Sequence, residues 1–347
     1  MNNITGRQET SSSVLYLALP AMILHYIGNG ISKHNSGFLI NFVIWSIIAF
    51  VLLRIIKGSF SNEFNETKVS NFISKFTEAV ILIFLVVITF YNFKSSTNAV
   101  YSVTSGVIKR NITALLPLIA SLICALCGIE AITRSSYMLF FLFVGVVGFI
   151  FFITFDGWAV SNLYPLMGNN THSTFSDYSV IGIYAPVLST YVLRSNVKGK
   201  LEGYFLARRT MLVVFLSALV LGLVCILTIP YPMGTLYGFS LKGIFSIANS
   251  GSFFHRFEIL LSFILMIIDI VSVAVGIYLI SKILSDITDS NDYKPFCLVI
   301  SLMIFYLDKL FSKTDVLIEY GVILSAVVFI LLFLQSLAVE VMHKFRF

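Results

Sequence analysis

The sequence predicts an all-α polytopic membrane protein with about ten transmembrane helices. Of its 347 residues, 58% are hydrophobic and only 12% are charged, whereas a soluble domain has about 25% charged residues. The apolar segments are long and continuous, as a bilayer-spanning helix of about 20 residues requires, and not short and alternating as in a barrel. No polar block long enough to fold separately interrupts them, so residues 1–347 are expected to form a single transmembrane domain.

Ten apolar segments are the candidate spans. Short polar segments separate them, and each is roughly as long as the hydrocarbon core requires. The first, sixth and ninth are the least regular, because they are short or contain helix breakers. In chain order the predicted spans are residues 12–31, 37–56, 76–93, 113–131, 137–155, 178–193, 210–229, 254–284, 295–311 and 316–342.

The distribution of Lys and Arg predicts that both termini are cytoplasmic. An even number of spans places both ends of the chain on one side of the membrane. With the N-terminus inside, about fifteen of the 23 basic residues fall in inner segments and about eight, including Lys94, fall in outer segments. This is the bias of the positive-inside rule. Topology therefore accounts for the net charge of +6, and no nucleic-acid partner is expected.

Helix breakers in two spans predict a binding site near the bilayer midplane. Pro20 lies in the middle of the first span, and Gly182 and Pro186 lie in the middle of the sixth. If the spans form two repeats of five, about 12–155 and 178–342, these helices correspond, and paired broken helices are typical of transporters built from inverted repeats. The alternative is that the prolines simply kink their helices, because proline is frequent in membrane spans.

Acidic residues inside the spans are a second group of candidates, because intramembrane charges are costly and often functional. Asp269 falls near the centre of the eighth span, where it could face a cavity or serve as a buried structural acceptor. Glu130 and Arg134 are four residues apart and are expected to form an ion pair at the membrane interface.

No sequence pattern indicates catalysis, so the protein is not expected to be an enzyme. The chain shows no nucleophile triad, phosphate-binding loop or dinucleotide fingerprint. Cys124 and Cys127 have the spacing of a redox or metal pair, but they lie in an apolar segment without a second pair. The five histidines show no ligand spacing. No metal site and no cofactors are therefore predicted.

Four short segments carry a family resemblance. Residues 4–8 read Ile-Thr-Gly-Arg-Gln, residues 128–134 Gly-Ile-Glu-Ala-Ile-Thr-Arg, residues 162–168 Asn-Leu-Tyr-Pro-Leu-Met-Gly, and residues 254–258 Phe-His-Arg-Phe-Glu. In this order, over nearly the whole chain, they resemble the motifs of the B-subunit family of spore germination receptors, the GerAB type. The sequence departs from the family pattern at Leu19 and Pro20, where the family usually carries glycine.

The resemblance implies the LeuT-like, inverted-repeat fold of the amino-acid/polycation/organocation transporters. It also implies a germinant receptor subunit in the inner spore membrane, with an A subunit and a lipid-anchored C subunit as partners. The ligand is a small germinant, commonly an amino acid. The residues expected to bind it are Pro20, Ala21, Leu24, Tyr91, Gly182, Tyr184, Pro186 and Asp269.

In this interpretation the ends of a bound amino acid meet different spans. Backbone amides near Pro20 to Leu24 face the carboxylate, with the positive end of a half-helix behind them. Tyr184 forms the opposing wall, and Asp269 or Tyr91 receives the amino group. Ligand occupancy then favours one arrangement of the two halves, and the change reaches the partner subunits through loops such as residues 194–209.

Two other functions remain open from the sequence. The chain could be an amino-acid secondary transporter, a permease of the same fold, or a structural subunit whose own pocket is vestigial. Uptake of ligand by the purified protein would favour the transporter over the receptor. Loss of the ligand response after Gly182→Trp, with the complex still assembled, would argue against a vestigial pocket.

Overall fold

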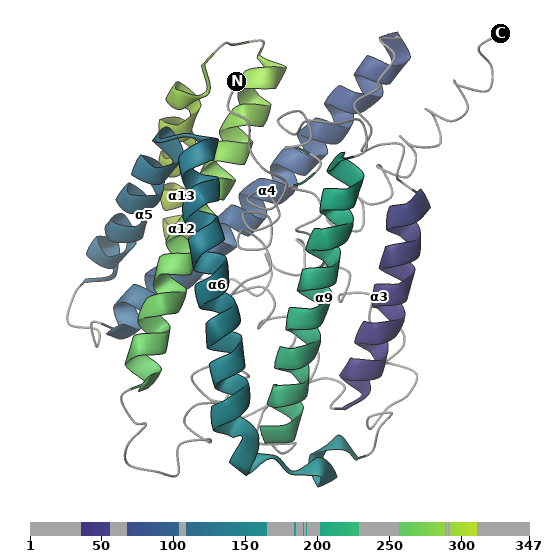
Figure 1. The fold of residues 1–347 in the computed structure, drawn as a ribbon. Helices are drawn as coiled ribbons and strands as arrows, with labels where there is room; N and C mark the ends of the chain where they lie inside the picture. Colours follow the sequence, from purple (N-terminus) through teal and green to yellow (C-terminus); the bar gives the residue numbers. More distant parts are fainter. Residues whose placement is uncertain are drawn as a thin grey trace, which may run out of the picture.

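The described part of the chain in the computed structural model is a bundle of long α-helices (Figure 1). The described residues are 36–55, 68–103, 109–164, 184, 190, 192, 202–228, 257–288, 290 and 292–310. Their elements are α3 (Gly37–Ile55), α4 (Lys68–Val103), α5 (Arg110–Leu126), α6 (Ile129–Thr154), η2 (Phe155–Gly157), η3 (Val160–Leu163), α9 (Glu202–Thr228), α12 (Phe257–Ile287) and α13 (Lys294–Leu310).

Among the described residues, five helical stretches are long and apolar enough to cross a membrane. They are Gly37–Ile55, Glu78–Asn98, Ile129–Thr154, Tyr204–Thr228 and Met266–Ile287, and they correspond to the predicted second, third, fifth, seventh and eighth spans. The predicted fourth and ninth spans correspond to α5 and α13, each of 17 residues. The predicted first and tenth spans lie outside the described residues, and so does most of the sixth.

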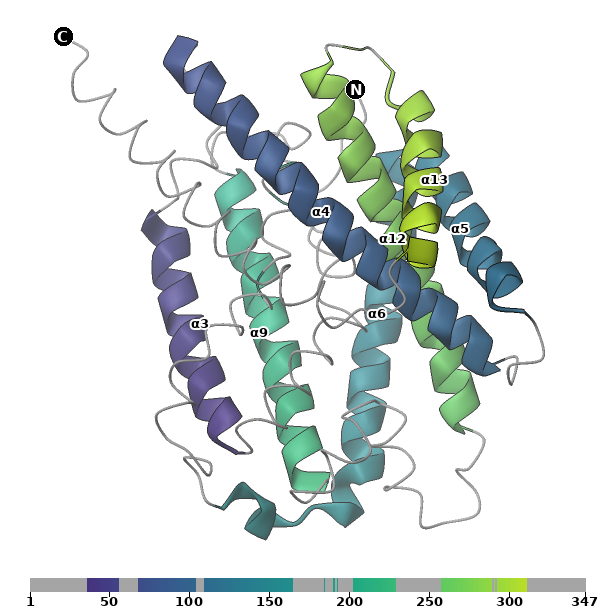
Figure 2. The same ribbon diagram turned by 180° about the vertical axis from the view of Figure 1, so that it is seen from behind.

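Two helices extend well beyond the segments that hydropathy marks. Helix α4 contains 36 residues and crosses the bundle obliquely (Figure 2). Helix α9 begins at Glu202, so the expected loop over residues 194–209 was wrong for its second half, which is helical. Lys94 was also misplaced in an outer segment, since it lies within α4 with only 4% of its surface exposed. A hydropathy pattern marks only the apolar segment that matches the thickness of the bilayer. The helix itself can extend beyond that segment, especially where it is tilted.

The turn between α5 and α6 corrects another predicted boundary. The predicted fourth span continued to residue 131, but α5 ends at Leu126 and α6 begins at Ile129. Gly128 lies between them with φ 88° and ψ 170°, a region that is essentially restricted to glycine. The expected Glu130–Arg134 ion pair is confirmed in the first turns of α6, on the exposed surface.

Helix α12 lies at the centre of one group of helices. All residues from 271 to 281 are buried, so this stretch is enclosed on every side, as expected of a helix that is apolar all round. Small side chains at Ser272, Ala274 and Gly276 permit close approach of neighbouring helices. Helices α4, α5, α13 and α6 contact α12, and the most extensive contact is with α4.

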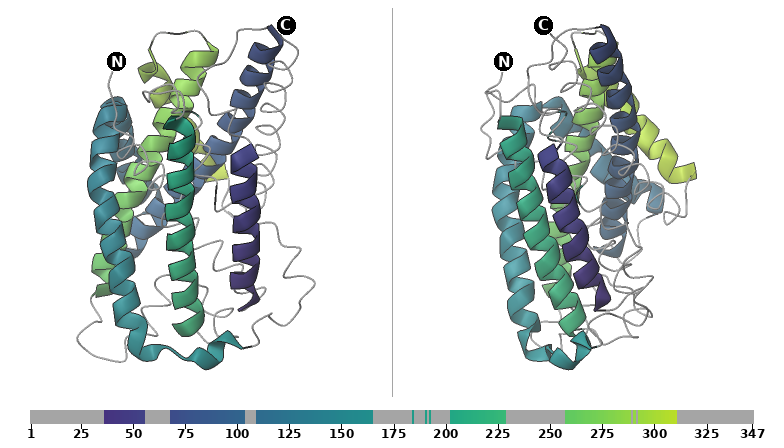
Figure 3. Two further views of the ribbon diagram at one scale, coloured as in Figure 1. Left: turned by 45° about the vertical axis from the view of Figure 1, so that its right-hand side comes forward. Right: turned by 90° about the vertical axis from the view of Figure 1, so that its right-hand side faces the viewer.

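A second group of helices packs beside the first. Helix α9 contacts both α3 and α6, and the three run side by side in the views of Figure 3. Helix α6 also contacts α12 and α5, so it joins the two groups. Many apolar side chains on α6 are exposed, with Met138 at 78% and Phe152 at 77%, as expected of a surface that faces lipid.

We expect Gly128→Ala to lower the stability of the protein by about 1–3 kcal/mol, because alanine is strained at this backbone conformation. A methyl group there would also lie 3.2 Å from the Tyr293 hydroxyl. The matched control is Gly145→Ala within α6, where an added methyl group meets no atom within 4 Å. Thermal unfolding in detergent measures both, and equal stability of the two variants would contradict this account of the turn.

Candidate ligand-binding site

The second half of α4 carries polar side chains that the fold buries. They lie within a stretch, Glu78–Asn98, that is otherwise apolar enough to span the membrane. Polar groups removed from water are costly unless they are hydrogen-bonded, so such a cluster is more informative than the apolar residues around it. The buried members are Thr89, Asn92, Lys94, Ser96 and Thr97.

One hydrogen bond links this polar stretch to α12. The Ser95 hydroxyl donates to Oδ2 of Asp269 over 3.0 Å. Asp269 lies near the middle of α12 with 1% of its surface exposed. The contact therefore joins the two most closely packed helices through an acidic side chain inside the membrane.

Three neighbouring hydroxyls of these two helices donate within their own helix. Ser96 and Thr97 both donate to the Phe93 carbonyl on α4, and Ser272 donates to the Ile268 carbonyl on α12. This local bonding is the usual way in which Ser and Thr are accommodated in helices. The Ser95 hydroxyl differs because it reaches the neighbouring helix.

The second oxygen of Asp269 defines what the site can do. Oδ1 is buried and makes no hydrogen bond to any residue in the described part of the chain. A carboxylate oxygen can accept hydrogen bonds from an ammonium or another donor. A buried carboxylate is strongly stabilised by such a partner, because burial without one is costly. Asp269 thus has the chemistry to receive an amino group.

Tyr184, the predicted opposing wall, is docked on α3. Its side chain is fully buried, and its hydroxyl donates to Ser46, which in turn donates to the Phe42 carbonyl. The Tyr184 ring stacks on the Phe42 ring at 6.3 Å between centroids and meets the edge of Phe50 at 6.5 Å. Its hydroxyl therefore faces α3.

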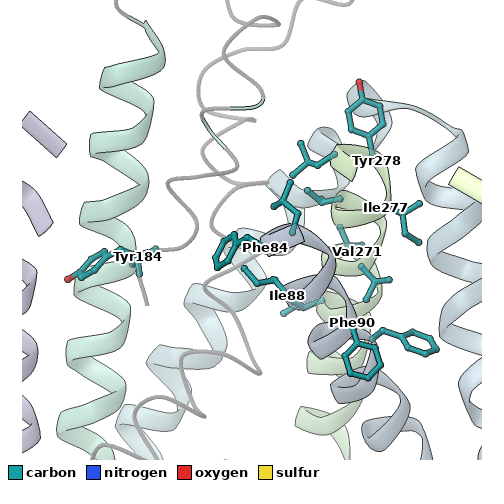
Figure 4. Packing of buried hydrophobic residues seen from close by; sticks show 14 of the residues in the cluster. Phe84, Ile88, Phe90, Tyr184, Val271, Ile277 and Tyr278 are labelled. Carbon is teal, nitrogen blue, oxygen red and sulfur yellow. The ribbon is translucent and has the colours of Figure 1, made fainter. Parts of the chain in front are cut away.

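The structure divides the predicted site residues between the two helix groups. Tyr91 is half-buried on α4, four residues before Ser95 and so on the same helix face, and this brings Tyr91 near the Asp269 contact. Tyr184 lies apart from the α4 and α12 core residues in Figure 4. The other predicted site residues, Pro20, Ala21, Leu24, Gly182 and Pro186, lie outside the described residues.

One residue of the site, and one proline elsewhere in the bundle, were missed at the sequence level. Ser95 was not predicted, although its signal was present as the polar run from residue 94 to 97 inside an apolar span. Pro117 was also overlooked as a helix breaker, and α5 continues through it. A proline in a span of this chain therefore does not by itself break the helix.

Metal binding has no basis in the described residues. Across those ranges no group of three or more His, Cys, Asp or Glu side chains is arranged to hold a metal ion. The chemistry that the described residues offer is hydrogen bonding and charge pairing at Asp269.

Similarity to known proteins is found at the level of structure. No protein-family profile and no curated protein sequence matches the chain. Mhp1, a nucleobase-cation-symport-1 family transporter solved in a closed conformation with bromovinylhydantoin bound, matches with a TM-score of 0.70 and 12% identity, covering 93% of this chain and 75% of that one. An Eremococcus coleocola manganese transporter, in complex with an aromatic bis-isothiourea substituted compound, matches with a TM-score of 0.62 and 12% identity, covering 94% and 76%.

The fold thus defines a class of membrane protein. The predicted fold class is confirmed: the described part of the chain is all-helical, and the chain has the LeuT-like fold of secondary transporters. At 12% identity this likeness shows the fold. The identity of the ligand depends on this chain's own residues.

We expect Ser95→Ala to destabilise the protein by about 1 kcal/mol, because it removes the hydroxyl that bonds Asp269 between helices. Ser96→Ala is the matched control, since its hydroxyl donates to the carbonyl of Phe93 in the same helix, and it should cost less than about 0.5 kcal/mol. Unfolding in mixed micelles compares the two. In the Asp269→Leu background, which offers no acceptor for the Ser95 hydroxyl, the two substitutions should have similar effects; an unchanged difference there would show that Ser95 does not act through Asp269.

Proposed function

We propose that the chain is the B subunit of a spore germinant receptor that binds a small germinant, an amino acid, in a transporter-like pocket. Binding signals to an A subunit and a lipid-anchored C subunit in the inner spore membrane, with both termini of the chain in the cytoplasm. The four GerAB-like segments support the receptor role, and the LeuT-like fold supports a small-molecule pocket.

The observation that carries the ligand assignment is the environment of Asp269. One oxygen is held by Ser95 and the other makes no hydrogen bond to a described residue. The Ser95 bond fixes the orientation of the carboxylate, so that Oδ1 is available to the ammonium group of an amino acid. Tyr91 lies on the Ser95 face of α4 and contributes to the same wall.

The two helix groups suggest how binding becomes a signal. Asp269 and Tyr91 belong to the group around α12, whereas Tyr184 is fixed to α3 in the group around α9. A ligand whose amino end pairs with Asp269 and whose other end contacts the sixth span touches both groups. Such a ligand favours the arrangement of the two groups in which it makes both contacts. The size of this shift is set by the difference between its affinities for the two arrangements.

An amino-acid permease is the second candidate, and the solved transporters of the same fold favour it. The two functions differ in one respect: a transporter must open to both sides of the membrane, whereas a receptor needs only a change that its partners read. Liposomes containing the purified chain should therefore bind the amino acid without accumulating it. Accumulation inside the liposomes would establish the permease instead.

We expect Asp269→Asn to weaken binding of the amino acid at least tenfold, because the amide carries no charge to pair with the ammonium group. Asp286→Asn is the matched control, with the same change on an exposed position of α12, and should leave affinity unchanged. Calorimetric titration with a panel of amino acids measures both variants. Spores carrying Asp269→Asn should also respond less to the same amino acid, and equal affinity of the two variants would refute the assignment.

A further inference from the structure

A cavity whose lining does not include Asp269 lies between the end of α3 and the beginning of α9. Its volume is about 680 Å³, and its walls include two arginines and three aromatic side chains, together with aliphatic residues. The lining residues are Ile47, Phe50, Val51, Leu53, Arg54, Tyr204, Phe205 and Arg208. The receptor function proposed above does not use this cavity.

Positive charge at this cavity has no partner among the described residues. Arg54 lies in the last turn of α3, and Arg208 lies in the second turn of α9. Both guanidinium groups are exposed, and neither forms an ion pair with a residue in the described ranges. Two arginine side chains at one cavity can bind phosphate oxygens through paired hydrogen bonds.

Beside the arginines the cavity is apolar and opens on the outer surface of the bundle. Ile47 is 59% exposed, Val51 54% and Phe205 52%. These residues belong to helical stretches that are long and apolar enough to lie in the membrane. The site thus combines charged donors at the helix ends with an apolar groove that continues toward the membrane interior.

The position of the cavity agrees with the charge distribution of the chain. The positive-inside rule places the end of α3 and the beginning of α9 on the cytoplasmic side. Basic residues also occur at the beginning of α6 and immediately after Arg208, at Arg134 and Arg209. The cytoplasmic leaflet carries anionic lipids, and basic pockets between helices on that side bind their headgroups.

We propose that this cavity is a binding site for one anionic phospholipid. The lipid phosphate lies between Arg54 and Arg208, and an acyl chain follows the groove along Val51 and Ile47, about one and two helical turns inward from Arg54. Tyr204 lies at the beginning of its span, the level at which tyrosine side chains meet the headgroup region. A bound lipid would link α3 to α9.

The first arm of the test uses the unaltered full-length protein. Native mass spectrometry of the protein in detergent, titrated with phosphatidylglycerol, should show one retained lipid. Phosphatidylcholine with the same acyl chains should bind at least tenfold more weakly, and inorganic phosphate should not displace the phosphatidylglycerol. Equal binding of the two lipids would show that the groove is merely apolar and would overturn the proposal. Displacement by phosphate would indicate a simple anion site and would also overturn it.

The second arm uses charge-matched variants. We expect Arg208→Gln to weaken phosphatidylglycerol binding about fivefold and Arg54→Gln/Arg208→Gln about 25-fold, from the usual contribution of a basic side chain near an anionic surface. The control pair Arg134→Gln/Arg209→Gln removes two positive charges in the same region but outside the cavity lining, and should leave the retained lipid bound. Equal loss in both pairs would show diffuse attraction without a site, and would contradict the proposal.

Discussion

The packing of α4 against α12 is the interaction on which the rest of the structure depends. Helix α12 is enclosed by other helices over residues 271 to 281, so it has no lipid-facing side there. In a bilayer, apolar side chains gain little by leaving lipid for protein, and close packing and interhelical hydrogen bonds hold helices together. The Ser95–Asp269 hydrogen bond lies in this contact, so the polar site is built into the most closely packed part of the fold.

Two helix groups follow from this arrangement. One is centred on α12, and the other consists of α3, α9 and α6, with α6 in contact with both. The second group holds its own polar contact, the hydroxyl chain from Tyr184 to Ser46, surrounded by stacked aromatic rings. Packing and hydrogen bonds thus hold the helices together within each group. The proposed ligand would change how the two groups are arranged relative to each other.

Each predicted span that falls within the described residues corresponds to a helix, because apolar length follows from the thickness of the bilayer. Asp269 was also predicted as a candidate site residue, because a carboxylate in the middle of a span is energetically costly and such residues are often functional. The sequence did not predict two features that depend on geometry. The α5–α6 turn depends on the conformation of Gly128, and Lys94 is buried within α4, which continues to Val103. Ser95 could not be distinguished from Ser96 or Thr97, because only the packing of α4 on α12 determines which hydroxyl faces Asp269.

The proposed function depends on a pairing between Asp269 and the amino group of the ligand. The most direct measurement is a thermodynamic cycle in which the preferred amino acid and its deaminated analogue are each titrated into the unaltered protein and into Asp269→Asn. Loss of the amino group should weaken binding to the unaltered protein by about 1.5–3 kcal/mol and should make little further difference in Asp269→Asn. An equal loss in both proteins would show that the amino group binds elsewhere and would contradict the account.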